Sequence, residues 1–408
     1  MKNLKKLLAL LLALIMLLSM AACGGAAGEK EPESTQDGEQ KEDTGLSNIN
    51  ALIEAGKYEE AYDQLKAIEN PSEEEEKLLK GFRFMPLKAE CSDGEYSEKC
   101  EFTYNENGRP ISIYMTEDEE WYKYDITYDD KGNAVTIKET AGEGSEDVEY
   151  SSTTTCTYDD KGNLLTENTT DSDGDTRNTT YTYHSNGTMK SRDETSSDGG
   201  TYSYTYDENG NTLTEICIAT DWSYSYIYTY DDKGNVLTEK MDSNGYIQNK
   251  TYTYTYDEKG NMLSKVCAED GGYTTTTVYT YDANGNRLTV NYSHSSGDSN
   301  SYTYTYDEKG NVLTEKYVSD NWSYTKTYTY DDKGNVLTEN RTTGDGTLAT
   351  TYTYDKYGNL ISKKETNNYN TENGPQTDVE TATYVWKLYY NPEFADEDFV
   401  AAYEYLIY

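Results

Sequence analysis

Two tryptophans in matching motifs are the residues of this chain best suited to contact a ligand. Trp222 and Tyr224 occur in D-W-S-Y, and Trp322 and Tyr324 occur in N-W-S-Y. Exposed aromatic rings can stack on sugars or on peptide side chains, whereas buried rings fill the space between neighbouring strands. Both roles are open from the sequence, and space filling is the commoner one. These four residues are our candidate ligand contacts, in a chain that we expect to have no enzymatic activity.

The residues that nucleophilic catalysis requires are scarce. The two histidines are His184, at a turn position, and His294, in the hydrophilic stretch NYSHSSGDSN. Neither sequence context pairs the histidine with a nucleophile and an orienting acid. Carboxylates are frequent, so a glycosidase pair stays open as an alternative. Most of them recur at the same position of a repeat, which favours a structural role.

We expect no metal and no cofactor. The chain has no C-x-x-C pair and only two histidines, which disfavours a zinc site. The acidic stretch DSDGD at 171–175 resembles a calcium loop, but Gly174 is fourth rather than sixth and Thr182 stands where a bidentate glutamate is needed. Weak calcium binding is left open. Among the cysteines, only Cys91 and Cys100 flank a turn-like segment and could form a local disulfide.

The charge and the aromatic content limit the function classes. The chain has 75 acidic and 35 basic residues and a formal charge of −40, which repels the phosphates of nucleic acids. Apolar residues make up only 35%, a value that suggests disorder. However, disordered segments are poor in aromatic residues, and this chain has 44 tyrosines. We expect a folded, tyrosine-packed, acidic protein that does not bind nucleic acid.

The N-terminus is typical of a secretory signal peptide. Lys2, Lys5 and Lys6 precede an apolar run over 7–20, which is shorter than the roughly 20 residues of a transmembrane anchor. The ending M-A-A-C resembles a bacterial lipobox, which implies that Cys23 becomes the lipid-modified first residue of the mature protein and anchors it to the membrane. The signal peptide then covers 1–22, and the polar segment 23–45 is expected to be a flexible acidic tether.

A helical segment is predicted over 46–81. Apolar residues recur at helical spacing, Gly56 separates two helices, and Pro71 ends the second. Ser72 and Glu75 form a capping box that opens a third helix through Leu79. The segment G-K-Y-E-E-A resembles a tetratricopeptide hairpin. A single hairpin cannot form the groove of such repeats, so a helical cap is the favoured interpretation.

A repeat occupies the rest of the chain, from 82 to 366. It is centred on eleven turn glycines, and eight of the ten spacings between them are 23–25 residues. Residues 228–239 and 328–339 are the identical dodecamer YTYDDKGNVLTE. The glycines are Gly108, Gly132, Gly162, Gly187, Gly210, Gly234, Gly260, Gly285, Gly310, Gly334 and Gly358.

Each copy predicts one β-hairpin. In TYTYTYDEKGNM, tyrosines alternate with threonines, which is typical of a strand with a Tyr face and a Thr face. Asp257 to Gly260 fits a type I turn with a bulge. The expected fold is mainly β: a solenoid or spiral sheet of about 11 hairpins and about 22 strands, with a small N-terminal helical cap. Two registers are open: Tyr256 faces Met262, or a shift by one residue puts Leu263 on the Tyr face.

The repeats YTYDDKGN, YTYDEKGN and CTYDDKGN resemble the YD repeats of the RHS family over roughly 100–365. That resemblance implies hairpins that spiral into a strip or a hollow shell around a toxin or partner. The chain departs from toxin-bearing members in two ways. None of its six prolines follows an aspartate, so the D-P-x-G self-cleavage signature is absent, and only a short segment follows the last copy.

The remaining segment, 367–408, is predicted to be a C-terminal cap made of a closing strand and a short amphipathic helix with Phe399, Tyr403 and Leu406 on one side. The function that we expect is a non-catalytic, surface-anchored scaffold for an extracellular glycan or protein partner. Two alternatives stay open: an accessory component of an RHS-type toxin-export or contact-competition system, and a glycan-active enzyme.

Overall fold

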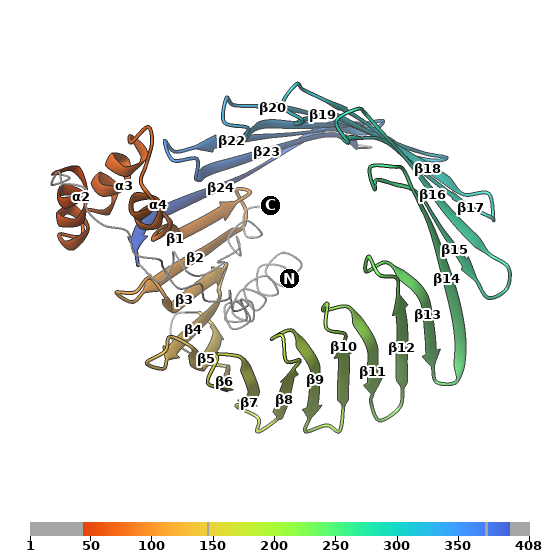
Figure 1. The fold of residues 1–408 in the computed structure, drawn as a ribbon, viewed down its shortest axis with the longest axis horizontal. Coiled ribbons are helices and arrows are strands. Elements are labelled where there is room, and N and C mark those ends of the chain that lie inside the picture. Colours follow the sequence, from red (N-terminus) through yellow and green to blue (C-terminus); the bar gives the residue numbers. More distant parts are fainter. Residues whose placement is uncertain (1–43, 145–146, 372–373, 392–408) are drawn as a thin grey trace, which may run out of the picture.

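The computed structural model describes residues 44–144, 147–371 and 374–391, which form three short helices and one antiparallel sheet (Figure 1). The helices are α2 (Thr44–Glu54), α3 (Tyr58–Lys66) and α4 (Glu73–Lys80). The strands are β1 (Phe82–Ser92), β2 (Ser97–Tyr104), β3 (Pro110–Glu117), β4 (Glu120–Tyr128), β5 (Ala134–Glu143), β6 (Tyr150–Tyr158), β7 (Leu164–Asp171), β8 (Thr176–Tyr183), β9 (Met189–Ser196), β10 (Thr201–Tyr206), β11 (Thr212–Ile218), β12 (Ser223–Tyr230), β13 (Val236–Ser243), β14 (Tyr246–Tyr256), β15 (Met262–Glu269), β16 (Thr274–Tyr281), β17 (Arg287–His294), β18 (Ser299–Tyr306), β19 (Val312–Ser319), β20 (Ser323–Tyr330), β21 (Val336–Thr343), β22 (Gly346–Tyr354), β23 (Leu360–Thr371) and β24 (Gly374–Tyr390). The expectation of a mainly β protein is confirmed.

The sheet is closed, so the predicted solenoid or spiral sheet is wrong. Each strand pairs with the next one in the chain, and β24 pairs with β1 along ten residue positions, from Phe82 opposite Tyr390 to Ser92 opposite Thr381. In Figure 1 the strands follow one another around a ring, and β24 lies beside β1. The architecture is therefore a 24-stranded antiparallel barrel.

Curvature and the need to cover edge strands explain the closure. Every repeat hairpin has a register shift beside its turn, such as the one between Thr255 and Tyr256, and a bulge of this kind bends and twists a sheet. Residues 82–92 and 374–390 lack the repeat motif but form β1 and β24. These two strands satisfy each other's backbone groups, which an open array would leave exposed.

The register is the first of the two that the sequence left open. Tyr256 is opposite Met262, and Thr255 is opposite Ser264, so Leu263 is the extra residue of the bulge. Leu263 is exposed, as are its equivalents Leu213, Leu313 and Leu337. On the other face, Leu164 occupies the position of Met262 and is buried. The tyrosines therefore share the more buried face of the sheet, which we call the Tyr face.

The repeat turns all lie along one edge of the barrel, which we call the repeat-turn edge. In the turn after β14, the Oδ1 of Asp257 accepts hydrogen bonds from the backbone N–H groups of Lys259 (2.9 Å) and Asn261 (2.8 Å). The side-chain amide of Asn261 donates to the other carboxylate oxygen at 2.8 Å. Gly260 has a φ of +89°, a conformation that favours glycine. Asp and Gly recur because both stabilise this turn, although Asn105 and His184 replace the aspartate in two of the eleven copies.

These turns predict a dependence of stability on pH. A hydrogen bond from the following asparagine lowers the pKa of six turn carboxyls, those of Asp207, Asp231, Asp257, Asp282, Asp307 and Asp331. Carboxyls with a depressed pKa stabilise the fold above the unfolded-state pKa of about 3.9, and the contribution is lost as the pH falls through the folded-state value. We expect the free energy of unfolding to fall below about pH 4. Urea unfolding of the Asn335→Ala variant should show a shallower acid slope than wild type, whereas Asn340→Ala, at an exposed position, should not.

A ladder of tyrosine hydroxyls links ten of the eleven repeat hairpins to the strand or hairpin before it, and the hairpin of β10 and β11 is the exception within the described part of the chain. Tyr330 of β20, for example, donates to the backbone carbonyl of Val312 at the bulge of the preceding hairpin (2.7 Å), where the strand pairing is interrupted. The indole N–H of Trp386 in β24 donates in the same way to Leu360 (2.7 Å) and continues the ladder across the last hairpin. The tyrosine donors are Tyr104, Tyr128, Tyr158, Tyr183, Tyr230, Tyr254, Tyr281, Tyr306, Tyr330 and Tyr354.

Tyr330→Phe should therefore destabilise the barrel. The substitution leaves the carbonyl of Val312 without its donor, at a cost of about 1–2 kcal/mol in the free energy of unfolding. Tyr256→Phe is the matched control, because the buried hydroxyl of Tyr256 has no hydrogen-bond partner among the described residues. Its removal should be neutral or slightly stabilising. Equal losses for the two variants in urea unfolding would contradict the ladder.

The helices pack at the seam between β1 and β24. The helix boundaries at Gly56 and the capping box of Ser72 with Glu75 are confirmed. Ile49, Ala61 and Leu65 form a buried cluster with Phe82 of β1 and Leu388 of β24. Lys356, in the last repeat turn, forms an ion pair with Asp63 of α3 (2.7 Å). The helical segment therefore covers the seam at the repeat-turn edge.

Several predictions fall on residues outside the described ranges. These are the signal peptide, lipidation of Cys23, the tether up to residue 43, and the C-terminal helix with Phe399, Tyr403 and Leu406. Within the described part of the chain, none of the helices has the length and hydropathy needed to cross a membrane.

Candidate ligand-binding surface

Trp222 begins a row of aromatic rings along β12, at the edge opposite the repeat turns, which we call the variable-turn edge. The rings of Trp222 and Tyr224 are stacked, with centroids 5.7 Å apart and an interplanar angle of 20°. Tyr226 and Tyr228 continue the row with centroid separations of 5.7 and 6.0 Å. Trp222 is 46% exposed, so its ring is accessible rather than space-filling. We call Trp222, Tyr224 and the adjacent Glu215 the Trp222 surface.

Trp322, which immediately precedes β20, belongs to a second aromatic cluster. Its ring contacts Tyr317 at 5.5 Å and Tyr324 at 5.1 Å between centroids, and it is 41% exposed. The guanidinium of Arg341, on the neighbouring strand β21, lies 5.0 Å from the centre of the Trp322 ring and 5.1 Å from that of Tyr324. We call Trp322, Tyr324 and Glu315 the Trp322 surface.

Each of these surfaces includes a carboxylate. The hydroxyl of Tyr224 donates to the Oε1 of Glu215 at 2.9 Å, and that of Tyr324 donates to the Oε1 of Glu315 at 2.5 Å. Burial, and after it the carboxylate, raises the pKa of both tyrosines, so both hydroxyls stay protonated at neutral pH. Each surface therefore presents aromatic rings beside a negative charge, which is suited to a ligand with a flat or apolar part and a cationic group.

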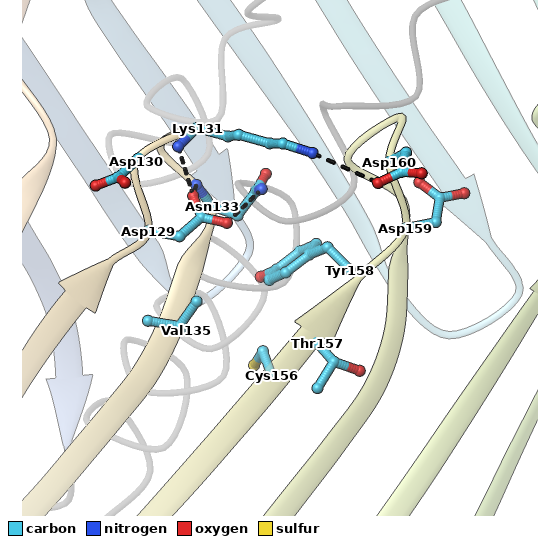
Figure 2. Close-up of a pocket in the computed structure, with 10 residues that line it drawn as sticks. All are labelled: Asp129, Asp130, Lys131, Asn133, Val135, Cys156, Thr157, Tyr158, Asp159 and Asp160. Carbon is cyan, nitrogen blue, oxygen red and sulfur yellow. Dashed lines mark hydrogen bonds and ion pairs between the residues drawn. The ribbon is translucent and has the colours of Figure 1, made fainter.

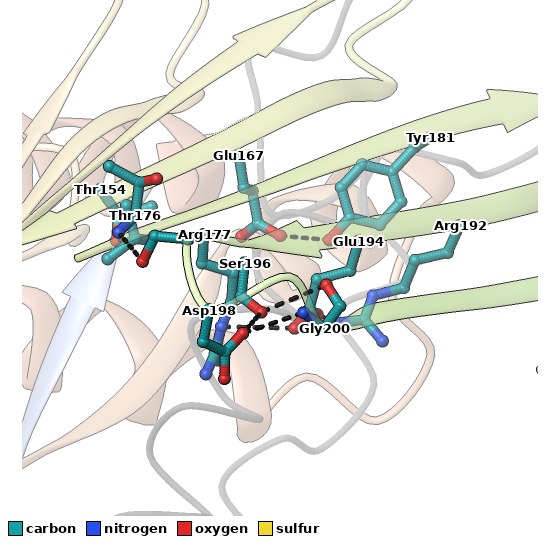
Figure 3. A network of polar contacts seen from close by, with 12 residues as sticks. Thr154, Glu167, Thr176, Arg177, Tyr181, Arg192, Glu194, Ser196, Asp198 and Gly200 are labelled. Carbon is teal, nitrogen blue, oxygen red and sulfur yellow. Dashed lines mark hydrogen bonds and ion pairs between the residues drawn. The ribbon is translucent and has the colours of Figure 1, made fainter. Parts of the chain in front are cut away.

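Carboxylate–tyrosine contacts recur on the Tyr face of other hairpins. Figure 3 shows the hydroxyl of Tyr181 donating to Glu167, and Glu194 beside two arginines. Glu194 pairs with Arg192 at 2.5 Å and with Arg177 at 3.3 Å. These groups satisfy one another across strands β7 to β9, which is a structural role. The recurrence weakens the hypothesis of a glycosidase pair, since such carboxylates occur in successive hairpins.

A pocket of about 320 Å³ opens at the repeat-turn edge between two successive turns (Figure 2). Lys131 extends from one turn toward Asp160 of the next, 3.9 Å away, and Tyr158 and Cys156 lie below. Burial, and after it the charge of Glu167, raises the pKa of Cys156 to about 12, so the thiol is protonated and a poor nucleophile at neutral pH. The pocket lining is Asp129, Asp130, Lys131, Asn133, Val135, Cys156, Thr157, Tyr158, Asp159 and Asp160.

The histidines are not arranged for hydrolysis. His184 contacts the backbone carbonyl of Tyr206 at 3.0 Å. The Nδ1 of His294 lies 2.5 Å from the hydroxyl of Ser296, which donates to Asp298 at 2.8 Å. The serine therefore stands between the histidine and the carboxylate, whereas a hydrolytic triad has the histidine in the middle.

The acidic stretch 171–175 forms a β-turn. The Oδ1 of Asp171 accepts the backbone N–H groups of Asp173 (3.0 Å) and Asp175 (2.9 Å). No group of three or more potential metal ligands is found among the residues that the structure describes. Cys91 and Cys100 are both free thiols, so the local disulfide that their spacing allowed is not formed.

Sequence reasoning found the two Trp–Tyr pairs but missed their partners. Glu215 and Glu315 precede the tryptophans by seven residues, and Arg341 follows Trp322 by 19. Their positions follow from the pairing of β20 with β19 and β21, in which Tyr317 is opposite Tyr324 and Arg341 is opposite Lys326. The D-x-x-G turn could have predicted these partners. Its position in the sequence sets the hairpin register once the bulge is included, and the register shows which residues are opposite one another.

Comparisons with known proteins give distant structural similarity only. No protein-family model and no curated protein matches the chain. The crystal structure of TcdB2-TccC3-Cdc42 is 15% identical, with a TM-score of 0.33, over 72% of this chain and 20% of that chain. The crystal structure of TcdB2-TccC3 is 16% identical, with a TM-score of 0.34, over 70% of this chain and 19% of that one. This chain thus spans about a fifth of the length of these two.

A porin-like protein from Bacteroides uniformis is also similar, at 12% identity and a TM-score of 0.24, over 74% of this chain and 96% of that chain. At these identities and TM-scores, no property of a neighbour is transferred to this chain. The functional argument therefore depends on the chain's own residues.

Proposed function

We propose that this protein is a non-catalytic binding scaffold, anchored by lipid on Cys23 to the extracytoplasmic face of a bacterial membrane. Its ligand is an extracellular glycan or a protein partner, bound at the variable-turn edge. The observation that carries the proposal is the exposure of the two tryptophans: Trp222 is 46% and Trp322 is 41% exposed, although each contacts a neighbouring aromatic ring. Exposed aromatic clusters of this kind are enriched at binding sites.

The barrel makes the two surfaces parts of one rigid scaffold. Trp222 and Trp322 immediately precede β12 and β20, which are eight strands apart in the sheet. At about 4.8 Å per strand, this corresponds to roughly 40 Å along the sheet. An extended ligand or a large partner can therefore contact both surfaces, and two weak contacts on one ligand bind more tightly than either alone.

The test uses the full-length lipoprotein in detergent micelles. Wild type is compared with the double variant Trp222→Ala, Trp322→Ala in a glycan array and in pull-downs from cell-wall and extracellular fractions. We expect the double variant to lose at least tenfold in affinity for the ligand that wild type binds. The control is Tyr246→Ala, which removes a tyrosine that is 66% exposed at the same edge and should leave binding unchanged. Equal binding by wild type and the double variant would disprove the proposal.

The membrane anchor has its own test. Mass spectrometry of the protein from membrane fractions should find diacylglycerol on Cys23 as the N-terminal residue. The Cys23→Ser variant should appear unprocessed and without lipid. A mature wild-type protein without lipid on Cys23 would remove the localisation part of the proposal and leave the binding part intact.

A further inference from the structure

The Trp222 and Trp322 surfaces are matched residue by residue, 100 positions apart. Both stand beside the same dodecamer, at 228–239 and 328–339. The registers also agree: Tyr226 is opposite Met241 in β12 and β13, and Lys326 is opposite Arg341 in β20 and β21. The chain therefore contains two versions of one arrangement, and their differences can be compared directly.

In the Trp322 surface, the aromatic rings contact the guanidinium of Arg341. Arg341 lies 5.0 Å from the centre of the Trp322 ring and 5.1 Å from that of Tyr324, and Tyr324 is hydrogen-bonded to Glu315. The Nε of Arg341 is buried and has no hydrogen-bond partner among the described residues, and the two rings lie within cation–π distance of its guanidinium. Lys326 adds a second cation on the same strands and pairs with Glu339 at 2.7 Å.

In the Trp222 surface, the chain supplies no cation at the two equivalent positions. Met241 replaces Arg341, and Tyr226 replaces Lys326. The rings and the carboxylate are kept, since Trp222 stacks on Tyr224 and Tyr224 donates to Glu215. The bulky ring of Tyr317 is replaced by the smaller Cys217.

Other cations near the Trp222 surface are directed elsewhere. Lys240 is next to Met241 in β13 and points to the opposite face, where it is opposite Ile227. Arg192, on an earlier hairpin, pairs with Glu194 at 2.5 Å and lies over the ring of Tyr204. The Trp222 surface therefore retains the groups that bind a guanidinium in the Trp322 surface, without the guanidinium.

We infer that the Trp222 surface binds an arginine side chain of a protein partner, in the place that Arg341 occupies in the Trp322 surface. The inference rests on the proposed scaffold function and specifies its ligand. A planar guanidinium can stack flat on Trp222 and Tyr224 while it faces Glu215, which an ammonium does less well. The chain's formal charge of −40 also attracts a basic partner segment.

Two substitutions test the inference: each gives Met241 or Arg341 the residue found at the equivalent position of the other surface. The probe is a peptide of alternating Arg and Gly, added to the full-length protein in micelles at 150 mM salt and followed by tryptophan fluorescence and calorimetry. Met241→Arg supplies the missing guanidinium from the chain and should weaken peptide binding roughly tenfold or more. Arg341→Met should open a second site and raise the stoichiometry from one to two. The control probe is a peptide in which citrulline replaces arginine. Citrulline has the shape of arginine without its charge, so neither wild type nor the two variants should bind this peptide.

The possible outcomes separate this inference from the proposed function. Unchanged peptide binding by Met241→Arg, with circular dichroism and the thermal midpoint as in wild type, would overturn the arginine site. Equal binding of the citrulline peptide, or capture of a neutral glycan that Met241→Arg does not weaken, would overturn it as well. In either case the scaffold proposal still stands if the Trp222→Ala, Trp322→Ala variant loses its ligand.

Discussion

The variant Ala382→Cys should form a disulfide with Cys91 and join the two ends of the sheet covalently. Ala382 in β24 is the residue opposite Cys91 in β1. Both side chains lie on the same face, since the thiol of Cys91 donates to Glu380, two residues from Ala382, at 3.0 Å. An open spiral would leave these positions at opposite ends of the array. Formation of this disulfide is therefore a direct test of barrel closure.

The disulfide should also stabilise the protein strongly. It closes a loop that contains almost the whole barrel, and loop-closure entropy predicts a gain of about 5 kcal/mol as an upper value. Burial, and after it the hydrogen bond to Glu380, raises the pKa of Cys91 to about 12. Since the thiolate is the reactive species, oxidation should be slow at neutral pH and faster near pH 10. Non-reducing electrophoresis and peptide mass spectrometry identify the cross-link, and urea unfolding measures the gain.

Thr383→Cys is the matched control for the cross-link. Thr383 is the next residue of β24 and is opposite Glu90, so its side chain lies on the other face of the sheet. It should form no disulfide with Cys91 under the same conditions. If Ala382→Cys stays reduced near pH 10 in a folded protein, the pairing of β1 with β24 is contradicted.

Met115→Ala should be strongly destabilising. Met115 in β3 is fully buried in a cluster with Cys100, Tyr124 and Ile126 on the first strands of the barrel. Removal of a buried methionine side chain costs the transfer free energy of the lost atoms and the energy of the remaining cavity, together about 2–5 kcal/mol. The midpoint of urea unfolding should fall accordingly.

Leu313→Ala is the control for the buried cluster. Leu313 is an apolar repeat residue that is 38% exposed, so its loss should cost less than about 1 kcal/mol. Similar losses for Met115→Ala and Leu313→Ala would show that β2 to β5 are no better packed than the repeat hairpins. That result would contradict the buried cluster.

Local features of this protein were readable from the sequence because they depend on short segments. Strict Tyr–Thr alternation predicts strands, and Asp with Gly three residues later predicts the turn that Asp257 and Gly260 form. The capping box of Ser72 and Glu75 predicts the start of α4 in the same way. Each of these features involves residues within a few positions of one another, so backbone geometry and local hydrogen bonds decide them.

The candidate site was readable only in part. The exposed tryptophans were selected by their repeated motif, but their exposure and their partners depend on strand pairing. Arg341 reaches Trp322 because the bulged hairpin register places β21 beside β20, and a shift by one residue would put it on the other face. The motif alone could not distinguish the arginine-filled surface from the one that carries Met241.

By itself, the sequence determined the hairpins, their turns, the Tyr and Thr faces of the first strand of the repeat hairpins and the helical segment before the sheet, but not the register of the return strands. Only the tertiary structure decided that the sheet closes. Closure depends on the twist and bend summed over all hairpins. It also depends on the pairing of Phe82–Ser92 with residues 381–390, which are about 300 positions away and lack the repeat motif. A periodic pattern specifies the step from one hairpin to the next. Whether many such steps return to the first strand depends on small angles that the pattern does not contain.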